Sequence, residues 1–579
     1  MKIRNIAGFA AITTVMAWVG AGCLDLQTAG ETGGQGGTGG LGQGGGGADT
    51  SSAMGGSGNS GQAGGAGGAG AGGACVPGAM TNCYPGPPDT QFKGVCQAGQ
   101  AVCDPPGTWS ACNGLVLPGL ESCDSVTDTN CDGRTGCKGI PESNVLVSGD
   151  EDEAVVAISI GKGVYGWDGP VYGTGYRNAT LDAAANPSSA EVLLVKRDSG
   201  GVLTDLSNRF FIDTFGHAWG RDIAVDSNGN VYVVGTYQGA SLNVGGQGLK
   251  TAGNATLGFL ASFDPSGNLR YVKDFGSTGT TEVKRVKVDA AGNVYISGKF
   301  DTSIDFGNNL VMSNGGFDGF VAAYSTTGAL VWRKTWSGTG DESVNAIAIS
   351  PDGALYAAAD FTVAVTVGGG PVFMTEGGMD ALISKHSIAD GSPLWYNEFG
   401  DTGDITITDM DTRGGDIAVL GAFRGKLALG GFNYTSNDGP NLWDIIVGTL
   451  EPNGGAVAST FPFLADGIQV ATSVSIDPLN DIVIGGYFMQ TLPLGGAIMD
   501  LTTGGDVNAF VVKFSPTLAV HWGHGYGNSL VQAFLDVAVE PTTGSTFVAG
   551  GLQGIMLGFG VQAPQSNSGF DAIIGRMTN

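Results

Sequence analysis

The sequence predicts an all-β protein: a seven-bladed β-propeller of four-stranded blades, preceded by a small disulfide-rich module and a Gly-rich linker. The first observation is a repeated phrase. "GNVYVVGTY" at Gly229 returns as "GNVYISGKF" at Gly292, and weaker copies recur about every 60–65 residues. The second is that each repeat contains four short runs with strand character. The third is that eight of the nine cysteines fall in one short segment.

The repeated units justify the propeller. In one clear unit, strand-like runs cover residues 344–350, 355–361, 380–386 and 393–399, and Asp, Ser and Gly residues between the first two suit a tight hairpin. One small residue near the end of each phrase marks seven units: Gly175, Gly235, Gly298, Ala359, Gly421, Gly486 and Gly550. Four strands repeated at this period predict propeller blades over residues 142–579.

The end of the chain suggests how the ring closes. The seventh unit stops after its third run, so its outer strand is missing. Residues 145–147, before the first unit, match the junction that normally follows a fourth run. Because an open ring would expose strand edges, we expect these residues to supply the missing strand.

The N-terminus has the features of an export signal. Lys2 and Arg4 precede an uncharged, mostly apolar run at residues 6–19, which is too short to span a membrane. The ending Ala21-Gly22-Cys23 resembles the lipobox of bacterial lipoproteins, although Gly20 stands where that family prefers Leu. The resemblance implies a signal peptide at residues 1–23 and a lipid on Cys23. An ordinary signal peptide with a chance cysteine is the alternative.

Residues 24–74 are Gly-rich and are expected to form a flexible tether. The membrane contact would be the lipid alone, in a bacterial cell envelope and at the outer membrane or cell surface rather than the inner membrane.

Residues 75–140 are expected to form a small module held by four disulfides, because eight cysteines crowd into a secreted segment with little apolar content. The sequence does not choose among the possible pairings. The cysteines are Cys75, Cys83, Cys96, Cys103, Cys112, Cys123, Cys131 and Cys137.

Part of this module resembles a secreted bacterial Cys-rich motif described as a putative metal-binding motif. The matching stretch is "LPGLESCDSVTDTNCDG", from Leu117 to Gly133. The resemblance implies that Asp124, Asp128 and Asp132 could supply oxygen ligands to a cation such as Ca²⁺. The alternative is that these aspartates cap turns.

The propeller units resemble the β-propeller repeat family of secreted bacterial proteins, which has the pattern D-x-x-G-N-V-Y-x-x-G, then D-A-F-V-x-K, then a strand bearing Trp. Trp332, Trp395 and Trp522 hold that last place here, with Tyr271 in an equivalent position. The resemblance implies the fold and says very little about function.

Acidic residues gather at one predicted mouth of the propeller. The formal net charge is −27, which disfavours nucleic acid as a partner. We expect a ring of carboxylates able to bind a cation, such as Ca²⁺, or a basic ligand, unless these residues only cap turns. Its members are Asp318, Asp380, Asp444 and Asp571, with Glu342 and Asp404 nearby.

Two classes of function remain open. The first is a binding or scaffold lipoprotein, expected to be a monomer, whose propeller holds a polymer, such as a glycan, or a protein. The alternative is an extracytoplasmic hydrolase or lyase acting on a polysaccharide. No motif in the sequence identifies a catalytic residue or a firm cofactor.

Overall fold

The structure is a computed structural model. It describes residues 75–578 except 88–89, 148–151, 163–167, 178–189, 208–210, 214–215, 277, 308–309, 437–441, 496–497, 504–505, 529, 557, 560–562 and 567–568. The predicted signal peptide, lipid-anchor residue Cys23 and Gly-rich tether lie outside the described residues. Among the described residues, no helix is long and apolar enough to cross a membrane.

The repeated phrase encodes a hairpin whose turn is organised by one aspartate. Asp226 Oδ1 accepts the backbone N–H groups of Asn228 and Asn230, both at 2.9 Å. Its Oδ2 accepts the side-chain amide of Asn230 at 2.7 Å and the hydroxyl of Tyr232 at 3.0 Å. The same bonds recur around Asp289. The Asp, Asn and Tyr that the two copies share therefore bond to one another within the turn.

The glycine that marks the period lies opposite a β-bulge in the first strand of its blade. A Cβ atom at Gly235 would lie 1.9 Å from the carbonyl oxygen of Trp219, and one at Gly298 would lie 1.8 Å from that of Glu282. At Gly235 and Gly298 the bulge brings one backbone against the other, so a side chain there would force the two strands to shift, whereas blade 4 carries Ala359 opposite the equivalent bulge.

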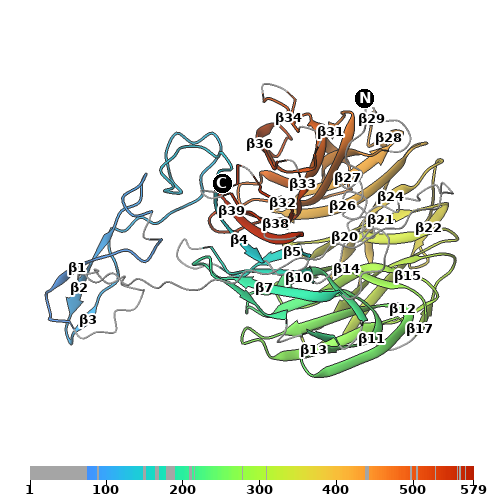
Figure 1. Ribbon diagram of the computed structural model, residues 1–579, viewed down its shortest axis with the longest axis horizontal. Coiled ribbons are helices and arrows are strands. Elements are labelled where there is room, and N and C mark those ends of the chain that lie inside the picture. The colour runs from blue at the N-terminus through green and yellow to red at the C-terminus, as the bar shows by residue number, and fades with distance from the viewer. Residues whose placement is uncertain are drawn as a thin grey trace, which may run out of the picture.

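Among the described residues, seven antiparallel sheets, each with a four-stranded core, follow one another around the propeller (Figure 1). This confirms the predicted fold. Blade 1 contains β5 (Glu153–Ile160), β6 (Val171–Arg177), β7 (Glu191–Arg197) and β8 (Leu203–Asp205). Blade 2 contains β10 (Gly216–Val225), β11 (Val231–Val244), β12 (Gln247–Phe263) and β13 (Leu269–Phe275). Blade 3 contains β14 (Thr281–Val288), β15 (Val294–Phe300), β18 (Asp318–Tyr324) and β19 (Leu330–Ser337).

The remaining blades continue around the ring in chain order. Blade 4 contains β20 (Glu342–Ser350), β21 (Ala354–Phe361), β24 (Asp380–Ser387) and β25 (Pro393–Phe399), and blade 5 contains β26 (Asp404–Arg413), β27 (Asp416–Arg424), β30 (Asp444–Leu450) and β31 (Val457–Phe463). Blade 6 contains β32 (Gly467–Ile476), β33 (Ile482–Leu492), β35 (Asn508–Phe514) and β36 (Val520–Tyr526). Blade 7 contains β37 (Gln532–Val539), β38 (Thr546–Leu552), β39 (Asp571–Met577) and β4 (Pro141–Val147).

The ring closes through a strand from the start of the propeller. β4 pairs with β39, with Val147 opposite Ala572 and Val145 opposite Ile574, as the sequence predicts. The side chain of Arg576 in β39 forms ion pairs with Glu142 in β4 and with Asp168 in blade 1. Hydrogen bonds and charges therefore join both ends of the propeller.

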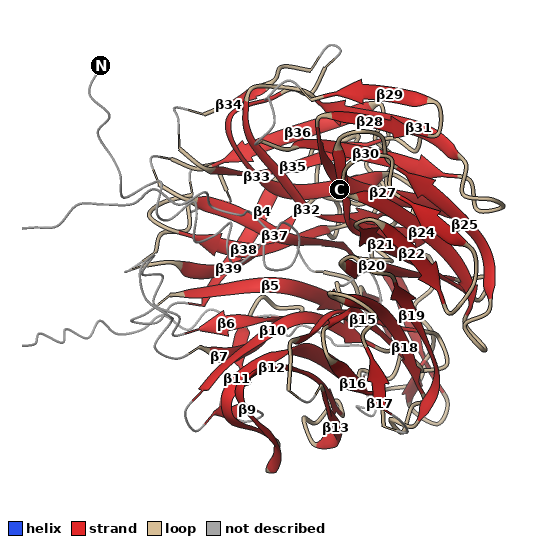
Figure 2. Cartoon of the chain, turned by 90° about the vertical axis from the view of Figure 1, so that its right-hand side faces the viewer, coloured by secondary structure: helices blue, strands red, loops and turns tan. Residues whose placement is uncertain are grey.

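Several connections between the second and third strands of a blade fold into extra hairpins, which leave the blades at the end where those two strands are joined. In Figure 2 these additions lie around the outside of the blades. We call these additions the hairpin rim. It contains β16 (Ser303–Asp305) with β17 (Leu310–Met312), β22 (Ala364–Val367) with β23 (Val372–Met374), β28 (Lys426–Leu429) with β29 (Phe432–Thr435), β34 (Leu501–Thr502), and the tip of the β11–β12 hairpin beside β9 (Phe211–Asp213).

The cores lie between neighbouring blades, and in several blades an aromatic residue of the outer strand contacts the next blade. Trp332 Nε1 donates to the carbonyl of Ile388 at 2.8 Å, and a Cβ atom at Gly391 would lie 2.7 Å from the Trp332 ring. Similar glycine contacts occur for Tyr271 with Gly328 and for Trp395 with Gly455. The tryptophan of the repeat is thus an inter-blade contact.

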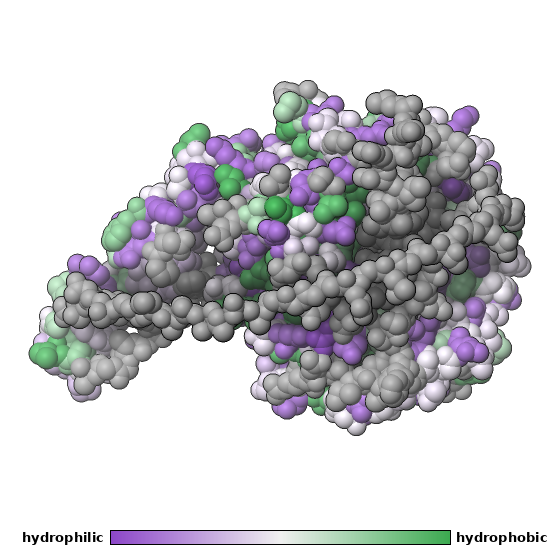
Figure 3. Space-filling model, viewed as in Figure 1, coloured by the Kyte–Doolittle hydropathy of each residue, from purple (hydrophilic) through white to green (hydrophobic). Residues whose placement is uncertain are grey.

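The cysteine-rich module extends to one side of blade 7 and contains β1 (Met80–Cys83), β2 (Gly99–Asp104) and β3 (Thr108–Trp109) (Figure 1). Hydrophilic and hydrophobic residues are intermixed on the visible surfaces of both parts (Figure 3). All eight cysteines are paired, which places the protein in an oxidising, extracytoplasmic compartment. The disulfides are Cys75–Cys103, Cys83–Cys112, Cys96–Cys131 and Cys123–Cys137.

Candidate functional site

The four aspartates expected at a mouth of the propeller are buried. Asp318, Asp380, Asp444 and Asp571 each begin the third strand of a blade, and none is more than 1% exposed. The carboxylates expected to ring the mouth are therefore not open to solvent at these four positions, and their binding of a cation or a ligand stays a prediction. Several of the preceding connections fold into the hairpin rim instead of ending as short loops, so the ends of the strands lie below the surface.

Two of these aspartates hold the chain that leads into their own strand. Asp318 Oδ1 accepts the N–H of Asn314 at 3.2 Å, and Asp380 Oδ2 accepts the N–H of Glu376 at 3.1 Å. These bonds agree with the turn-capping alternative. Asp404, which was expected in the same ring, forms an ion pair with Arg424.

The buried acids lie at the seams between blades. The N–H of Glu342, at the start of blade 4, donates to the carbonyl of Phe317 in blade 3 at 2.7 Å, next to Asp318. The strand register identifies the equivalent two residues at each of the seven seams, one in the third strand of a blade and one in the first strand of the next blade. They are Glu191 with Ala218, Leu257 with Thr281, Asp318 with Glu342, Asp380 with Ile405, Asp444 with Gln469, Asn508 with Gln532, and Asp571 with Glu153.

The seams differ in charge. Burial, together with the nearby Asp318 carboxylate, raises the pKa of Glu342 to about 8. Burial also raises the pKa of Asp318, and it raises the pKa of Asp380 to about 6. Two acids therefore meet at the seam between blades 3 and 4, whereas two amides meet at the Asn508–Gln532 seam.

The three aspartates of the putative metal-binding motif do not come together. Asp128 is buried and its Oδ2 accepts the N–H of Gly133 at 2.9 Å, while Asp132 Oδ1 accepts the N–H of Arg134 at 2.8 Å. Asp124 is exposed. Two of the three thus have turn-capping roles, and within the described residues the three carboxylates are not grouped at metal-ligand distances.

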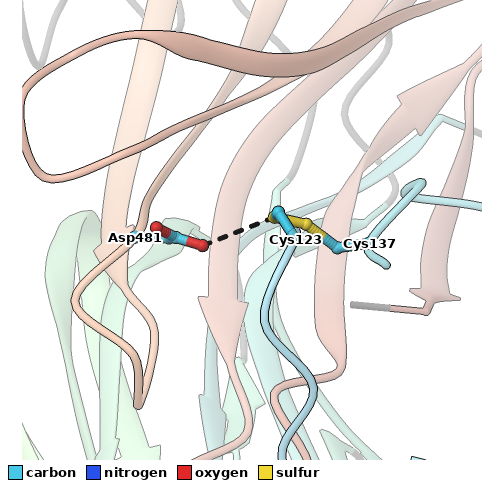
Figure 4. A group of neighbouring side chains, drawn as sticks. All are labelled: Cys123, Cys137 and Asp481. Carbon is cyan, nitrogen blue, oxygen red and sulfur yellow. Dashed lines mark hydrogen bonds between the residues drawn. A yellow bond between two sulfur atoms is a disulfide. The ribbon is translucent and has the colours of Figure 1, made fainter. Parts of the chain in front are cut away.

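One group of donor atoms does lie close together where the module meets blade 6. Asp481 Oδ2 is 3.5 Å from Sγ of Cys123, which is bonded to Cys137 (Figure 4). A disulfide sulfur has no thiolate to offer, so this arrangement is not a metal centre. Asp481 instead contacts His521 at 3.4 Å and Lys513 at 3.5 Å.

The central channel contains a charged group that the sequence reasoning missed. A cavity of about 300 Å³ is lined by the innermost strands of all seven blades. Lys287 lies near four carboxylates, which raise its pKa against the opposing effect of burial. Those acids are Asp222, Asp409, Asp411 and Asp536. The sequence did contain a signal for this group, namely the polar residues at alternate positions in "KRVKV" (284–288) and "TDMDT" (408–412). An innermost strand with both faces buried would be apolar instead.

The channel acids serve the fold. Asp222 Oδ2 accepts the N–H of Val286 at 2.8 Å, and Asp536 Oδ2 accepts the N–H of Ile158 at 2.6 Å. Each acceptor lies one blade before its donor, so carboxylates satisfy N–H groups on the inner edge of the next blade. Desolvation raises the pKa of Asp536 to about 7 despite this bond.

Comparison with known proteins agrees with the architecture. Residues 211–239 match the model of a family described as "Beta-propeller repeat". The chain carries a β-propeller repeat. Among curated proteins, "Uncharacterized WD repeat-containing protein L264" of Acanthamoeba polyphaga mimivirus is 22% identical over 400 residues, which cover 55% of this chain and 28% of the relative. The chain thus spans less than a third of that relative's length.

Several solved structures also match much of the chain. The Dos1 propeller matches with a TM-score of 0.39 and 10% identity, over 76% of this chain and 94% of that chain. Quinohemoprotein alcohol dehydrogenase ADHIIG from Pseudomonas putida HK5 has a TM-score of 0.37 and 12% identity, over 76% of each chain. BamB from Moraxella catarrhalis has a TM-score of 0.25 and 12% identity, over 60% of this chain and 97% of that chain. With such low TM-scores, none of these matches bears on ligand or reaction.

Proposed function

We propose that the protein is a monomeric, lipid-anchored binding module of the bacterial cell envelope, which uses its propeller to hold a protein or a glycan polymer. The observation that carries this proposal is the hairpin rim. Extra hairpins are added at one end of several blades, and they carry large apolar side chains into solvent. Such exposed apolar residues on a rigid scaffold are typical of interaction surfaces.

The exposed residues recur at related places. On β17, Leu310 and Met312 are 57% and 61% exposed. On β23, Val372 and Met374 are 63% and 64% exposed. Phe432, on the corresponding strand β29, is also exposed. Three neighbouring blades therefore present apolar residues on the second strand of the same kind of hairpin.

The channel is less suited to a large ligand. Its volume of about 300 Å³ fits only a small molecule. Its acids already accept backbone N–H groups, so a ligand would compete with bonds that support the blades. These features favour the rim as the binding surface.

The enzymatic alternative gains no support from a Ser–His contact among the described residues that resembles part of a catalytic triad. Ser384 Oγ lies 2.9 Å from His386 Nε2. Both side chains are buried, and burial lowers the pKa of His386 to about 4. A polymer cannot reach this hydroxyl, so we interpret the pair as part of the core.

The rim is tested with the full-length protein on protein and glycan arrays, followed by affinity measurements on any ligand found. The combined variant Leu310→Ser, Met312→Ser, Val372→Ser and Met374→Ser should weaken binding at least about tenfold, because apolar contact area is lost. Val202→Ser is the matched control, since Val202 is 62% exposed but lies at the opposite end of blade 1. Equal binding by both variants would exclude the rim.

The anchor is tested separately. Cys23→Ser should release the protein from the membrane fraction or block its maturation, because the acylated side chain is removed. Normal fractionation and maturation of this variant would contradict the lipoprotein proposal.

A further inference from the structure

The seam between blades 3 and 4 contains two acids in an unusual setting. Asp318 begins β18 and Glu342 begins β20, and each is 1% exposed. The bond between the Glu342 N–H and the Phe317 carbonyl fixes the two strand ends side by side. The register therefore delivers two carboxyl groups from different blades to one buried place.

Glu342 lacks the partners that a buried carboxyl group requires. Neither Oε1 nor Oε2 has a hydrogen-bond partner of normal geometry among the described residues. The charged groups that act on it are Asp318 and Asp341, both acids, and only the Gly338 N–H opposes their effect. An unpartnered buried carboxylate beside two like charges is strongly unfavourable without a positive species nearby.

The surroundings offer more oxygen atoms than the two acids alone. Asp318 uses Oδ1 to accept the Asn314 N–H and also interacts with the hydroxyl of Ser337. Two carboxylates together with neutral oxygens form the donor set that hard divalent cations prefer.

We propose that Asp318 and Glu342 bind a hard divalent cation of the Ca²⁺ type, which joins blade 3 to blade 4 from within the seam. This site differs from the expected exposed ring, because it is buried and depends on one pair of blades. It is also independent of the hairpin rim and of any ligand that the rim holds.

The chain contains a natural comparison for this site. At the equivalent seam between blades 6 and 7, Asn508 and Gln532 replace the two acids, and Gln532 Nε2 donates to Asn528 Oδ1 at 3.1 Å and to the carbonyl of Gln553 at 2.7 Å. At this seam the Gln532 side chain is thus held by hydrogen bonds, and neither side chain carries a charge. The seam between blades 7 and 1 has Asp571 and Glu153, so it shares the acidic composition.

The test uses the full chain, freed of metal with a chelator and then titrated with Ca²⁺ at pH 7.5. We expect a saturable calorimetric signal and a rise in the Tm of the propeller. Glu342→Gln should reduce the number of bound ions by one and diminish the rise in Tm. Asp318→Asn is a second variant with the same expectation. Both changes copy groups that the seam between blades 6 and 7 already contains.

The converse variant, Asn508→Asp with Gln532→Glu, should gain one bound ion. Absence of any saturable Ca²⁺ response in the wild type would overturn the proposal and leave the pair as a site that holds a proton. An unchanged stoichiometry in both loss variants would also overturn it. If neither loss variant folds, the gain variant decides: one additional ion supports the proposal, and none contradicts it.

Discussion

The cysteine-rich module and the propeller are stabilised by different means. Among the described residues of the module, the buried apolar side chains are Cys96, Ala101, Cys103 and Cys131, so cross-links replace a hydrophobic core. The propeller contains no cysteine after Cys137, and large apolar clusters fill the spaces between its blades. The difference shows that one exported chain can combine covalent stabilisation in a small part with packing in a large one.

The two parts meet through a contact that copies the one between blades. Trp332 of blade 3 contacts Gly391, which lies in the turn between the third and fourth strands of blade 4. Blade 7 has no such turn for Trp522 of blade 6 to contact, because its fourth strand is β4 from the start of the propeller. Gly139 takes that place, and a Cβ atom there would lie 2.5 Å from the Trp522 ring. The His524 ring also bonds to the carbonyl of Lys138 at 2.7 Å. The end of the module thus completes the repeat.

Reduction should separate the two kinds of stability and produce the largest effect. Under a dithiol reductant, the module should unfold, because loss of one native disulfide from a small domain typically costs about 2–5 kcal/mol and four are lost here. The propeller should remain folded. Limited proteolysis followed by mass spectrometry should show cleavage within residues 75–137 and protection beyond residue 152. Loss of both regions in one transition would contradict this independence, and an unreduced sample is the control.

The contact at Gly139 should matter to the propeller as much as a contact between blades. Trp522→Ala should lower the free energy of unfolding by about 3 kcal/mol, because a large buried ring leaves a cavity. Trp332→Ala, which removes the equivalent contact with Gly391, is the matched comparison. Denaturant unfolding would measure both. A large loss for Trp332→Ala and none for Trp522→Ala would mean that the module contributes nothing to the ring.

The propeller transition should also depend on pH in a direction set by its buried acids. The pKa values of Glu342, Asp536 and Asp380 are raised to about 8, 7 and 6, so the fold favours their protonated forms. Their stabilising contribution is fully present below the unfolded-state pKa and is lost as pH rises through these folded-state values. In the presence of a chelator, Tm should therefore fall by several degrees between pH 5 and pH 9.

Glu342→Gln provides the control for that profile. It should remove the fall in Tm between about pH 7 and pH 8, where only Glu342 still titrates, and make the fall at lower pH shallower, because Glu342 holds its extra proton at every pH between its unfolded-state and folded-state pKa values. A Tm that rises steadily from pH 5 to pH 9 would contradict the assignment of these acids.

The sequence was sufficient for the features that depend on local chemistry. Asp226 and Tyr232 contact each other within one turn, and Gly235 faces its own blade, so a single repeat reveals their pattern. The closing strand was predictable because a missing fourth run implies a replacement. These interactions are short-range, or they repeat with the period of the fold.

The candidate sites depended on contacts that the sequence does not display. The burial of Asp318 follows from its position at the end of its strand and from how the neighbouring chain folds. The roles of Asp222 and Asp536 follow from N–H groups on the next blade, which lie far away in the chain. Recognition of a repeat locates equivalent positions but does not show which of them reach solvent.

The smallest effect is expected inside the module, where Asp128 holds a turn between cross-links. Asp128→Ala removes the acceptor of the Gly133 N–H and should lower the stability of the oxidised module by about 1 kcal/mol. Asp124→Ala should have no measurable effect, because Asp124 is exposed. Hydrogen exchange at the backbone of residues 128–134 would detect so small a change.

Repeating the hydrogen-exchange measurement with Ca²⁺ also tests the resemblance to the metal-binding motif, since Asp128 Oδ1 is buried and has no hydrogen-bond partner among the described residues. If Ca²⁺ slows exchange and both substitutions abolish that effect, the result would indicate a metal site. If Ca²⁺ has no effect and protection is lost only in Asp128→Ala, turn capping would be the whole role of this aspartate.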